Sequence, residues 1–137
     1  MWWIYALLSA FFAALTAIFA KIGIKGVDTD LATAIRTAVI LLIAWGIAIF
    51  RGATGTIGDL TKTNWIFLVF SGCATGLSWI FYFKALQLGK VSQVAPVDKL
   101  SVAIAIILAV IFLGEPLTLK SAAGAILIIG GTLVLIF

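Results

Sequence analysis

Residues 95–116 read APVDKLSVAIAIILAVIFLGEP, and this stretch decides in which solvent the chain folds. From Leu100 to Leu113 it contains no charged residue, yet Asp98 and Lys99 stand directly before that apolar run. A charged side chain near the interior of a lipid bilayer is costly, so such a residue is a candidate for a functional site by default. The interpretation of this pair depends on whether the whole chain lies in a bilayer.

The composition of the chain favours lipid as the solvent. Of the 137 residues, 64% are hydrophobic and 10% are charged. Soluble domains are about 45–50% apolar and about 25% charged, and a soluble chain of this size cannot bury so large an apolar share. The formal net charge is +4, but the basic residues stand singly and form no basic stripe. We therefore expect a membrane protein without a nucleic-acid partner.

Five runs with few or no charges divide the chain, each close to the roughly 20 residues that cross a bilayer as a helix. The runs are Trp2–Ala20, Leu31–Phe50, Asn64–Phe83, Ser92–Leu113 and Ser121–Phe137. In lipid each segment must satisfy its own backbone groups, which predicts helices. The strands of a barrel would alternate in polarity, and these runs do not. The predicted fold is all-α and polytopic, with five transmembrane helices in a single domain, residues 1–137.

The ends of these runs lead to further expectations. The first run lacks a basic start and a small-residue cleavage site, so we interpret it as a retained span and not as a signal peptide. Thr29 or Asp30 is expected to cap the second helix. Pro116 is expected to lie in the first turn of the fifth helix.

Basic residues in the connections divide almost evenly between the two sides of the bilayer. Three lie on the side of the N-terminus and four on the other: Arg51, Lys62 and Lys120 against Lys21, Lys25, Lys84 and Lys90. Orientation follows the bias of such residues, and here the bias is nearly absent. Two interpretations stay open. Either one orientation wins weakly, or the chain inserts both ways and forms an antiparallel homodimer, which would reproduce the inverted repeats of many transporters.

The chain lacks the residue patterns of catalysis and metal binding. It has no histidine and one cysteine, Cys73, so it contains no Ser-His or Cys-His pair and no imidazole ligand for a metal. The glycine-rich stretch RGATGTIG at residues 51–58 lacks a preceding strand and the GK[ST] ending of a phosphate-binding loop. We expect no enzyme, no cofactor and no metal.

The third run carries polar and aromatic residues on one helical face, because they recur at i, i+4, i+8 and i+11. They are Ser71, Thr75, Trp79 and Tyr82. Beside them, Gly72 and Gly76 form a G-x-x-x-G pair. Two interpretations stay open: close helix packing through small residues, or the wall of a transport pathway.

Three charged residues lie within the predicted spans: Arg36, Asp98 and Lys99. Asp98 lies six residues after the expected helix start at Ser92, and Arg36 lies at the same depth in the second run. Six helical residues rise about 9 Å, so these opposite charges are expected to pair. Lys99 lies about 100° from Asp98 around a helix and is expected to find another partner, water or a ligand.

The surplus of one cation at this depth predicts an anionic or zwitterionic ligand, because a cation in low dielectric needs a counter-charge. We expect Lys99 to hold the acid group of this small-molecule substrate, while Arg36 and Asp98 pair in the empty site. The alternative is a structural pair that locks the second helix to the fourth. Pro96 removes a backbone donor just before Asp98 and is expected to kink the helix or delay its start.

Residues 82–101, YFKALQLGKVSQVAPVDKLS, and residues 113–135, LGEPLTLKSAAGAILIIGGTLVL, resemble the EamA-type domain of the drug/metabolite transporter (DMT) superfamily. The matching elements are the aromatic-x-x-Ala-Leu of Tyr82–Leu86, the Ala-Pro before the fourth core, the Gly-Glu at its end and the glycines of the last helix. The resemblance covers the whole chain and points to the five-helix bacterial and archaeal branch. It implies a cavity lined by the first four helices, with the fifth supporting assembly, and most members fuse two such halves.

The resemblance implies a secondary transporter of a small polar, amino-acid-like metabolite. It would act as a homodimer by alternating access in the cell membrane of a bacterium or archaeon. The four-helix multidrug pumps of the superfamily use an acidic residue in the first helix, and Trp2–Ala20 contains none. A proton-coupled multidrug exporter is the nearest alternative, with Asp98 in that role. An accessory subunit without transport is the second, although packing alone does not need three charges within the spans.

Overall fold

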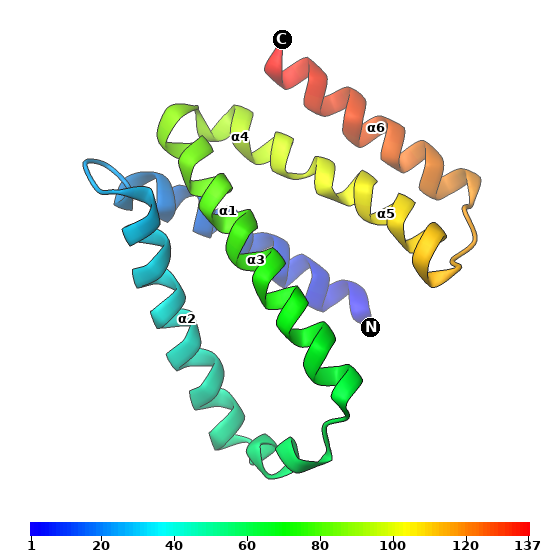
Figure 1. The fold of residues 1–137 in the computed structure, drawn as a ribbon. Coiled ribbons are helices and arrows are strands. Elements are labelled where there is room, and N and C mark those ends of the chain that lie inside the picture. Colours follow the sequence, from blue (N-terminus) through cyan, green and yellow to red (C-terminus); the bar gives the residue numbers. More distant parts are fainter. The chain divides into compact units, whose positions relative to one another are not determined.

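The computed structural model describes all residues from 1 to 137, and every regular element in it is a helix (Figure 1). In chain order these are α1 (Trp2–Gly23), α2 (Thr29–Phe50), the 3₁₀ helix η1 (Ala53–Asp59), α3 (Lys62–Leu88), α4 (Val91–Asp98), α5 (Leu100–Leu113) and α6 (Leu119–Ile136). Five segments are long and apolar enough to cross a bilayer, with α4 and α5 together forming the fourth. The prediction of an all-α, polytopic membrane fold with five spans is confirmed.

Several helices extend past the ends expected from hydropathy. The third reaches Leu88 instead of Phe83, and the first reaches Gly23 instead of Ala20. Hydropathy marks only the part of a helix that lies in hydrocarbon, whereas the backbone hydrogen bonds continue into the polar interface. The extra turns carry polar residues, Lys21 on α1 and Lys84 and Gln87 on α3.

The cap of α2 differs from the one expected. Asp28 caps this helix, instead of Thr29 or Asp30. Its carboxylate accepts hydrogen bonds from the backbone N–H groups of Asp30 and Leu31 at 2.9 and 3.2 Å. Thr29 is already the first helical residue and is buried. Aspartate is a stronger N-cap than threonine, and here it satisfies two donors that the helix leaves free.

The last helix begins at Leu119, two residues before the expected run Ser121–Phe137 but after Pro116. Thr118 and Ser121 form a capping box, in which each hydroxyl accepts a hydrogen bond from the other's backbone N–H at 3.1 Å. Pro116, expected in the first turn, lies before this cap in the link from Gly114 to Thr118. Gly114 lets the chain leave α5, because its φ of 66° is a left-handed value that side chains disfavour. The reciprocal bonds of the capping box decide where the helix starts.

The chain divides into two compact units. Unit 1 contains Met1–Ile18 and Leu88–Phe137, and unit 2 contains Phe19–Gln87. The first boundary falls inside α1 and the second at the end of α3. Each unit contains buried residues, and the charged residues within the predicted spans are divided between them: Arg36 is in unit 2, and Asp98 and Lys99 are in unit 1.

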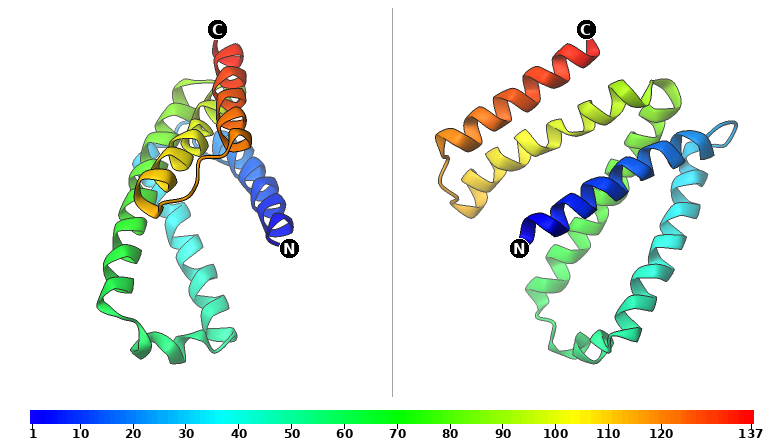
Figure 2. Two further views of the ribbon diagram at one scale, coloured as in Figure 1. Left: turned by 90° about the vertical axis from the view of Figure 1, so that its right-hand side faces the viewer. Right: turned by 180° about the vertical axis from the view of Figure 1, so that it is seen from behind.

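Unit 2 is a helical hairpin in which η1 links α2 to α3 (Figure 2). Its buried residues lie toward the end away from η1: Ile24, Thr29, Thr33, Phe83 and Leu86. At this end the Lys21 ammonium donates to the Leu86 carbonyl, and the Gln87 amide donates to the Val27 carbonyl at 3.1 Å. These bonds tie the end of α1 and its following turn to the end of α3.

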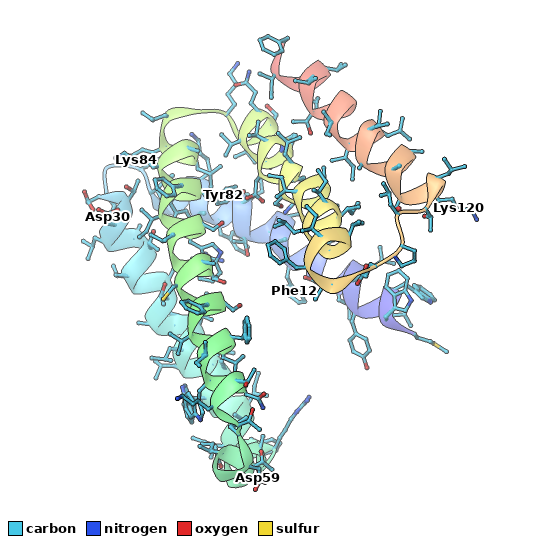
Figure 3. The ribbon with its side chains drawn as sticks, turned by 45° about the vertical axis from the view of Figure 1, so that its right-hand side comes forward. Phe12, Asp30, Asp59, Tyr82, Lys84 and Lys120 are labelled. Carbon is cyan, nitrogen blue, oxygen red and sulfur yellow. The ribbon has the colours of Figure 1, made fainter.

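Charged residues of unit 2 lie mainly at the two ends of the hairpin. Asp30 and Lys84 lie toward the end that holds the buried residues, and Asp59 lies at η1 (Figure 3). Between these ends, Arg36 is the charged residue of α2. Charged ends and an apolar middle are the distribution expected of a hairpin that crosses a bilayer.

In unit 1, α6 packs antiparallel against both α4 and α5 (Figure 2). Small residues at this contact are buried, Ala103 on α5 and Thr132 on α6. Small side chains let membrane helices approach closely. The Thr132 hydroxyl also donates to the Pro96 carbonyl at 3.2 Å, which joins α6 to the start of the fourth span.

Most apolar side chains of the spans are exposed. Only 6% of each span is buried, and side chains such as Leu42 and Phe112 are 74% and 78% exposed. In water, apolar surface costs about 25 cal/mol per Å², whereas in a bilayer the lipid tails solvate it. Lipid or a second protein surface must therefore cover these helices.

Candidate functional site

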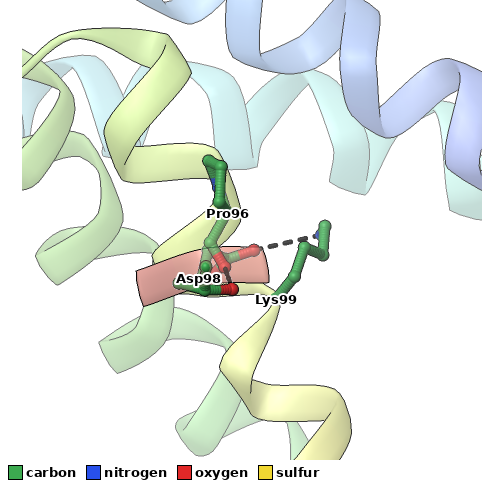
Figure 4. Close-up of polar contacts among 4 residues, drawn as sticks. Pro96, Asp98 and Lys99 are labelled. Carbon is green, nitrogen blue, oxygen red and sulfur yellow. Dashed lines mark hydrogen bonds and ion pairs between the residues drawn. The ribbon is translucent and has the colours of Figure 1, made fainter. Parts of the chain in front are cut away.

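The fourth span is interrupted at Lys99, between α4 and α5 (Figure 4). Pro96 lies inside α4 and has no backbone donor, so the regular hydrogen-bond pattern cannot continue through it. The Lys99 N–H is shared between the carbonyls of Ala95 and Pro96 at 3.3 and 3.0 Å. The Lys99 carbonyl accepts from the Val102 N–H at 3.0 Å. Such bonds between residues three apart tighten the helix locally and turn its path.

Asp98 and Lys99 form an ion pair at this break, with 3.1 Å between Lys99 Nζ and Asp98 Oδ2 (Figure 4). The expectation that these adjacent residues lie too far apart around the helix to meet is wrong. The helix is interrupted here, and the four-carbon stem of lysine reaches back across the break. The side chains are 56% (Lys99) and 34% (Asp98) exposed, and the pair carries no net charge.

Arg36 lies against two aromatic rings of α3. Its guanidinium carbon is 3.9 Å from the centroid of the Trp79 ring and 5.3 Å from that of Phe83. Both distances are within the roughly 6 Å range of a cation–π contact. Phe83 is buried, and Arg36 and Trp79 are half-buried. The Tyr82 ring lies beside that of Phe83, with 6.4 Å between the two ring centroids.

The charge of Arg36 is not balanced within unit 2, where it forms no ion pair. Unit 2 has three acidic residues: Asp28 caps α2, Asp30 lies in the first turn of α2 and forms no ion pair with Arg36, and Asp59 lies at the opposite end of the hairpin (Figure 3). An aromatic ring attracts a cation through its quadrupole but has no net charge. Arg36 is therefore a cation inside a span that is held by rings alone.

The predicted site residues fall into two groups. Unit 2 holds Arg36, Ser71, Thr75, Trp79 and Tyr82, and unit 1 holds Pro96, Asp98 and Lys99. The structure brings Arg36 together with Trp79 and Asp98 together with Lys99. A pair between Arg36 and Asp98 would join the two units, and it stays a prediction.

Phe83 is a contact residue that the sequence analysis did not include. It follows Trp79 by four residues, so the two rings share one face of α3. The i, i+4 spacing of Trp79 and Phe83 is visible in the sequence and indicates that both rings can contact one cation. The predicted polar stripe contains Tyr82 and omits Phe83. Because Phe83 belongs to the buried core of unit 2, it joins the position of Arg36 to the packing of the hairpin.

The polar face of α3 continues from Trp79 toward η1. Ser71 and Thr75 lie on it and are exposed, and the Thr75 hydroxyl donates to the Ser71 carbonyl at 2.9 Å. A Cβ built at Gly72 or Gly76 would meet nothing within 4 Å. Neither glycine is packed against another helix of unit 2, so this face is open to lipid, to a ligand or to another helix.

A groove lies in unit 1, between α5 and the start of α6. It is an open groove of about 450 Å³. Its lining is apolar except for Glu115, Thr118 and Ser121, and the two hydroxyls already serve the capping box. None of the predicted site residues lines it.

Five spans, charges within them and an open polar helix face define a multi-pass membrane protein of the kind that moves small molecules. The chain belongs to the EamA-like transporter family, whose model matches residues 1–137. This match confirms the resemblance to the EamA-type domains of the DMT superfamily. It identifies the protein as a membrane transporter and points away from an enzyme.

Two relatives carry the same indication. The chain is 47% identical over 134 residues to an uncharacterized transporter in the cobO 3' region of a Sinorhizobium species. This alignment covers 98% of this chain and 95% of that protein. It is 29% identical over 129 residues to the uncharacterized transporter YxxF of Bacillus subtilis, which covers 93% of this chain but 40% of that protein. No solved structure matches the chain significantly.

Proposed function

We propose that this protein is a secondary transporter of a small anionic or zwitterionic metabolite, amino-acid-like in size and polarity. It acts in the cell membrane of a bacterium or archaeon, with residues 1–137 as one domain. The observation that carries the proposal is the charge inside the apolar runs, away from the helix ends: in Leu31–Phe50 and Ser92–Leu113, Arg36 and Lys99 are cations and Asp98 is the one anion. Charges in hydrocarbon are rare and mark pathways for ions and substrates. A net positive site favours a ligand with a carboxylate over a lipophilic cation.

The proposed site has a polar centre and a mixed wall. The charged residues proposed for the centre are Arg36 in unit 2 and the Asp98–Lys99 pair in unit 1, and the residues proposed for the wall are Ser71, Thr75, Trp79 and Tyr82 in unit 2. Hydroxyls and aromatic faces are the combination that small-molecule sites use for orientation and fit. The break after Pro96 supports this placement, since irregular backbone at membrane depth is tolerated where it lines a cavity or is buried in protein.

We further propose that the transporter is a homodimer that works by alternating access. The exposed apolar faces of the spans leave room for a second copy. The two relatives also differ in length: the alignment with this chain covers 95% of one and 40% of the other. A protein more than twice as long has room for two such units, and a homodimer of this chain would supply the same number of spans. Opposite insertion of two copies would give inverted repeats around a shared site.

Counterflow into proteoliposomes tests the proposed function. Vesicles with the purified protein are loaded with one unlabelled amino acid or short organic acid, and uptake of the labelled compound is measured. We expect accumulation of at least one acidic or zwitterionic compound above protein-free vesicles. Accumulation of tetraphenylphosphonium, a lipophilic cation, would instead indicate a multidrug exporter. No counterflow from folded, reconstituted protein would favour an accessory subunit.

Cysteine labelling tests the orientation. Cys73→Ser removes the one native thiol, and a new cysteine then replaces either Lys25, between α1 and α2, or Thr54, in η1. These positions lie in successive connections and hence on opposite sides of the bilayer. With dual insertion, a membrane-impermeant maleimide labels about half of each variant in intact cells. Full labelling of one variant and protection of the other would overturn the antiparallel dimer.

A further inference from the structure

We propose that Arg36, placed by Trp79 and Phe83, is the residue that holds the carboxylate of the transported ligand through a two-point contact. This inference rests on the proposed function and names the group that the site recognises. The sequence alone assigned this role to Lys99. In the structure Lys99 is paired with Asp98, whereas Arg36 has no acidic partner within unit 2.

The first argument is the electrostatic difference between the two cations. Lys99 has a carboxylate at 3.1 Å, so a ligand anion would have to displace Asp98 and leave that charge without a partner. Arg36 has ring faces at 3.9 and 5.3 Å and no acidic partner within unit 2. An anion arriving at Arg36 gains a charge-assisted contact and breaks no ion pair of unit 2.

The second argument is the shape of the guanidinium. It is planar, and its N–H donors lie in the plane in a fork that matches the two oxygens of a carboxylate. A ring stacked on its face leaves the donor edge free. Trp79 therefore restrains the plane of Arg36 and still permits a bidentate contact, which is stronger and more directional than a bond to a single ammonium.

The third argument is the surroundings of that edge. Thr75 and Ser71 lie one and two turns before Trp79 on the same face of α3, at about 6 and 12 Å along the helix axis. Both are exposed. A short ligand with its carboxylate at Arg36 could present polar groups to these hydroxyls, which favours an organic acid or amino acid over a long amphiphile.

A lipid phosphate is the competing occupant, because long basic side chains in a span often extend toward the headgroups. In this structure the guanidinium turns toward α3 and lies over the Trp79 ring. Its position is thus set by a protein contact. Inorganic phosphate and anionic lipid are used as separate arms of the test.

Chemical protection of arginine tests the inference. The chain has two arginines, Arg36 within α2 and Arg51 at its C-terminal cap, so Arg51 is an internal control. The protein in phosphatidylcholine vesicles is treated with phenylglyoxal, which modifies arginine, and each adduct is quantified by peptide mass spectrometry. The probes are the common amino acids and short mono- and dicarboxylates, each compared with its amide. Inorganic phosphate and vesicles containing phosphatidylglycerol are the additional arms.

We expect at least one carboxylate to slow modification of Arg36 roughly tenfold at ten times its dissociation constant, with no effect on Arg51 and none from the amide. Arg36→Lys keeps the charge but loses the fork, so it should weaken binding of that carboxylate by roughly tenfold or more, measured as ligand-induced thermal stabilisation. Arg51→Lys is the matched control and should bind as the parent does.

Three results would overturn the inference: no carboxylate protects Arg36 better than its amide; phosphate or anionic lipid protects it and carboxylates do not; or Arg36→Lys binds the carboxylate as tightly as the parent. Counterflow separates this failure from failure of the proposed function. Carboxylate transport at the parent rate by Arg36→Gln refutes the role of Arg36 and leaves transport standing. Protection of Arg36 without any counterflow refutes transport and leaves the carboxylate contact standing.

Discussion

The two cations within the spans are stabilised in different ways. At the break between α4 and α5, Lys99 is paired with the carboxylate of the neighbouring Asp98. In the α2–α3 hairpin, Arg36 rests on the faces of Trp79 and Phe83. In the first arrangement a carboxylate balances the charge of the cation. In the second, aromatic rings hold the cation in place, and no acidic group of unit 2 balances its charge. A charged residue in a span therefore cannot be interpreted from its depth alone, because the chemistry of its neighbours decides whether it can take a ligand.

Replacing Arg36 or Lys99 with a neutral residue should give the largest difference in carboxylate affinity between the two regions. Arg36→Gln is expected to weaken binding of the carboxylate ligand by about 10- to 100-fold, since hydrogen bonds to charged groups contribute about 1.5–3 kcal/mol. Lys99→Gln should weaken it by less than Arg36→Gln, because Asp98 already balances that cation. Isothermal titration of both variants in nanodiscs measures the two affinities, and a larger loss in Lys99→Gln would reverse the assignment.

Opening the closed pair should affect stability before it affects binding. Asp98→Asn leaves Lys99 without a carboxylate and is expected to lower the free energy of unfolding by about 1–3 kcal/mol. The double variant Asp98→Asn with Lys99→Gln removes both charges and should recover most of that loss. Denaturant unfolding followed by tryptophan fluorescence compares the variants. A double variant no more stable than the single one would show that the pair does not act as a unit.

Changing the ring beneath Arg36 tests whether it positions the guanidinium. Trp79→Leu removes a cation–π contact of about 0.5–2 kcal/mol and should weaken carboxylate binding by about 2- to 30-fold. Trp79→Phe keeps a ring and should lose less. A structural role alone would lower the stability of both variants without separating their affinities, so unfolding and binding are measured on the same samples. Equal affinity of Trp79→Leu and the parent would remove Trp79 from the site.

The smallest effect is expected at the bond that joins α6 to the break. Thr132→Val keeps the shape of the side chain and removes the donor to the Pro96 carbonyl, which should cost about 1 kcal/mol of unfolding free energy. Carboxylate affinity should stay at the parent value, because the bond removed is to the Pro96 carbonyl and involves none of the side chains proposed to contact the ligand. Thermal unfolding and titration of the variant check both statements, and a clear loss of affinity would show that the two regions are coupled.

Much of the fold follows from local composition. A run of about 20 apolar residues partitions into lipid as a helix whatever its neighbours are, so the five spans could be read without coordinates. Helix caps were harder to place. Asp28, Thr29 and Asp30 are all acceptable N-caps, and the choice depends on which backbone donors each side chain reaches in the folded turn.

The contacts of the charged residues could not be predicted from local composition. Counting residues placed Arg36 and Asp98 at one depth, but depth says nothing of the direction in which a helix turns each side chain. The contact between Asp98 and Lys99 depends on the local break, which changes the angle between successive residues. The contact of Arg36 with Phe83 depends on how α2 and α3 pack around their buried end.

The sequence by itself determined the solvent of this protein, its spans, its family and the residue types of the candidate site, because these depend on composition and on spacing along one chain. Only the tertiary structure showed that Lys99 pairs with Asp98 and that Arg36 lies over the rings of Trp79 and Phe83. A charge is balanced by whatever lies within a few ångströms of it, and that neighbourhood is set by the rotation and packing of helices, which residue order alone does not specify.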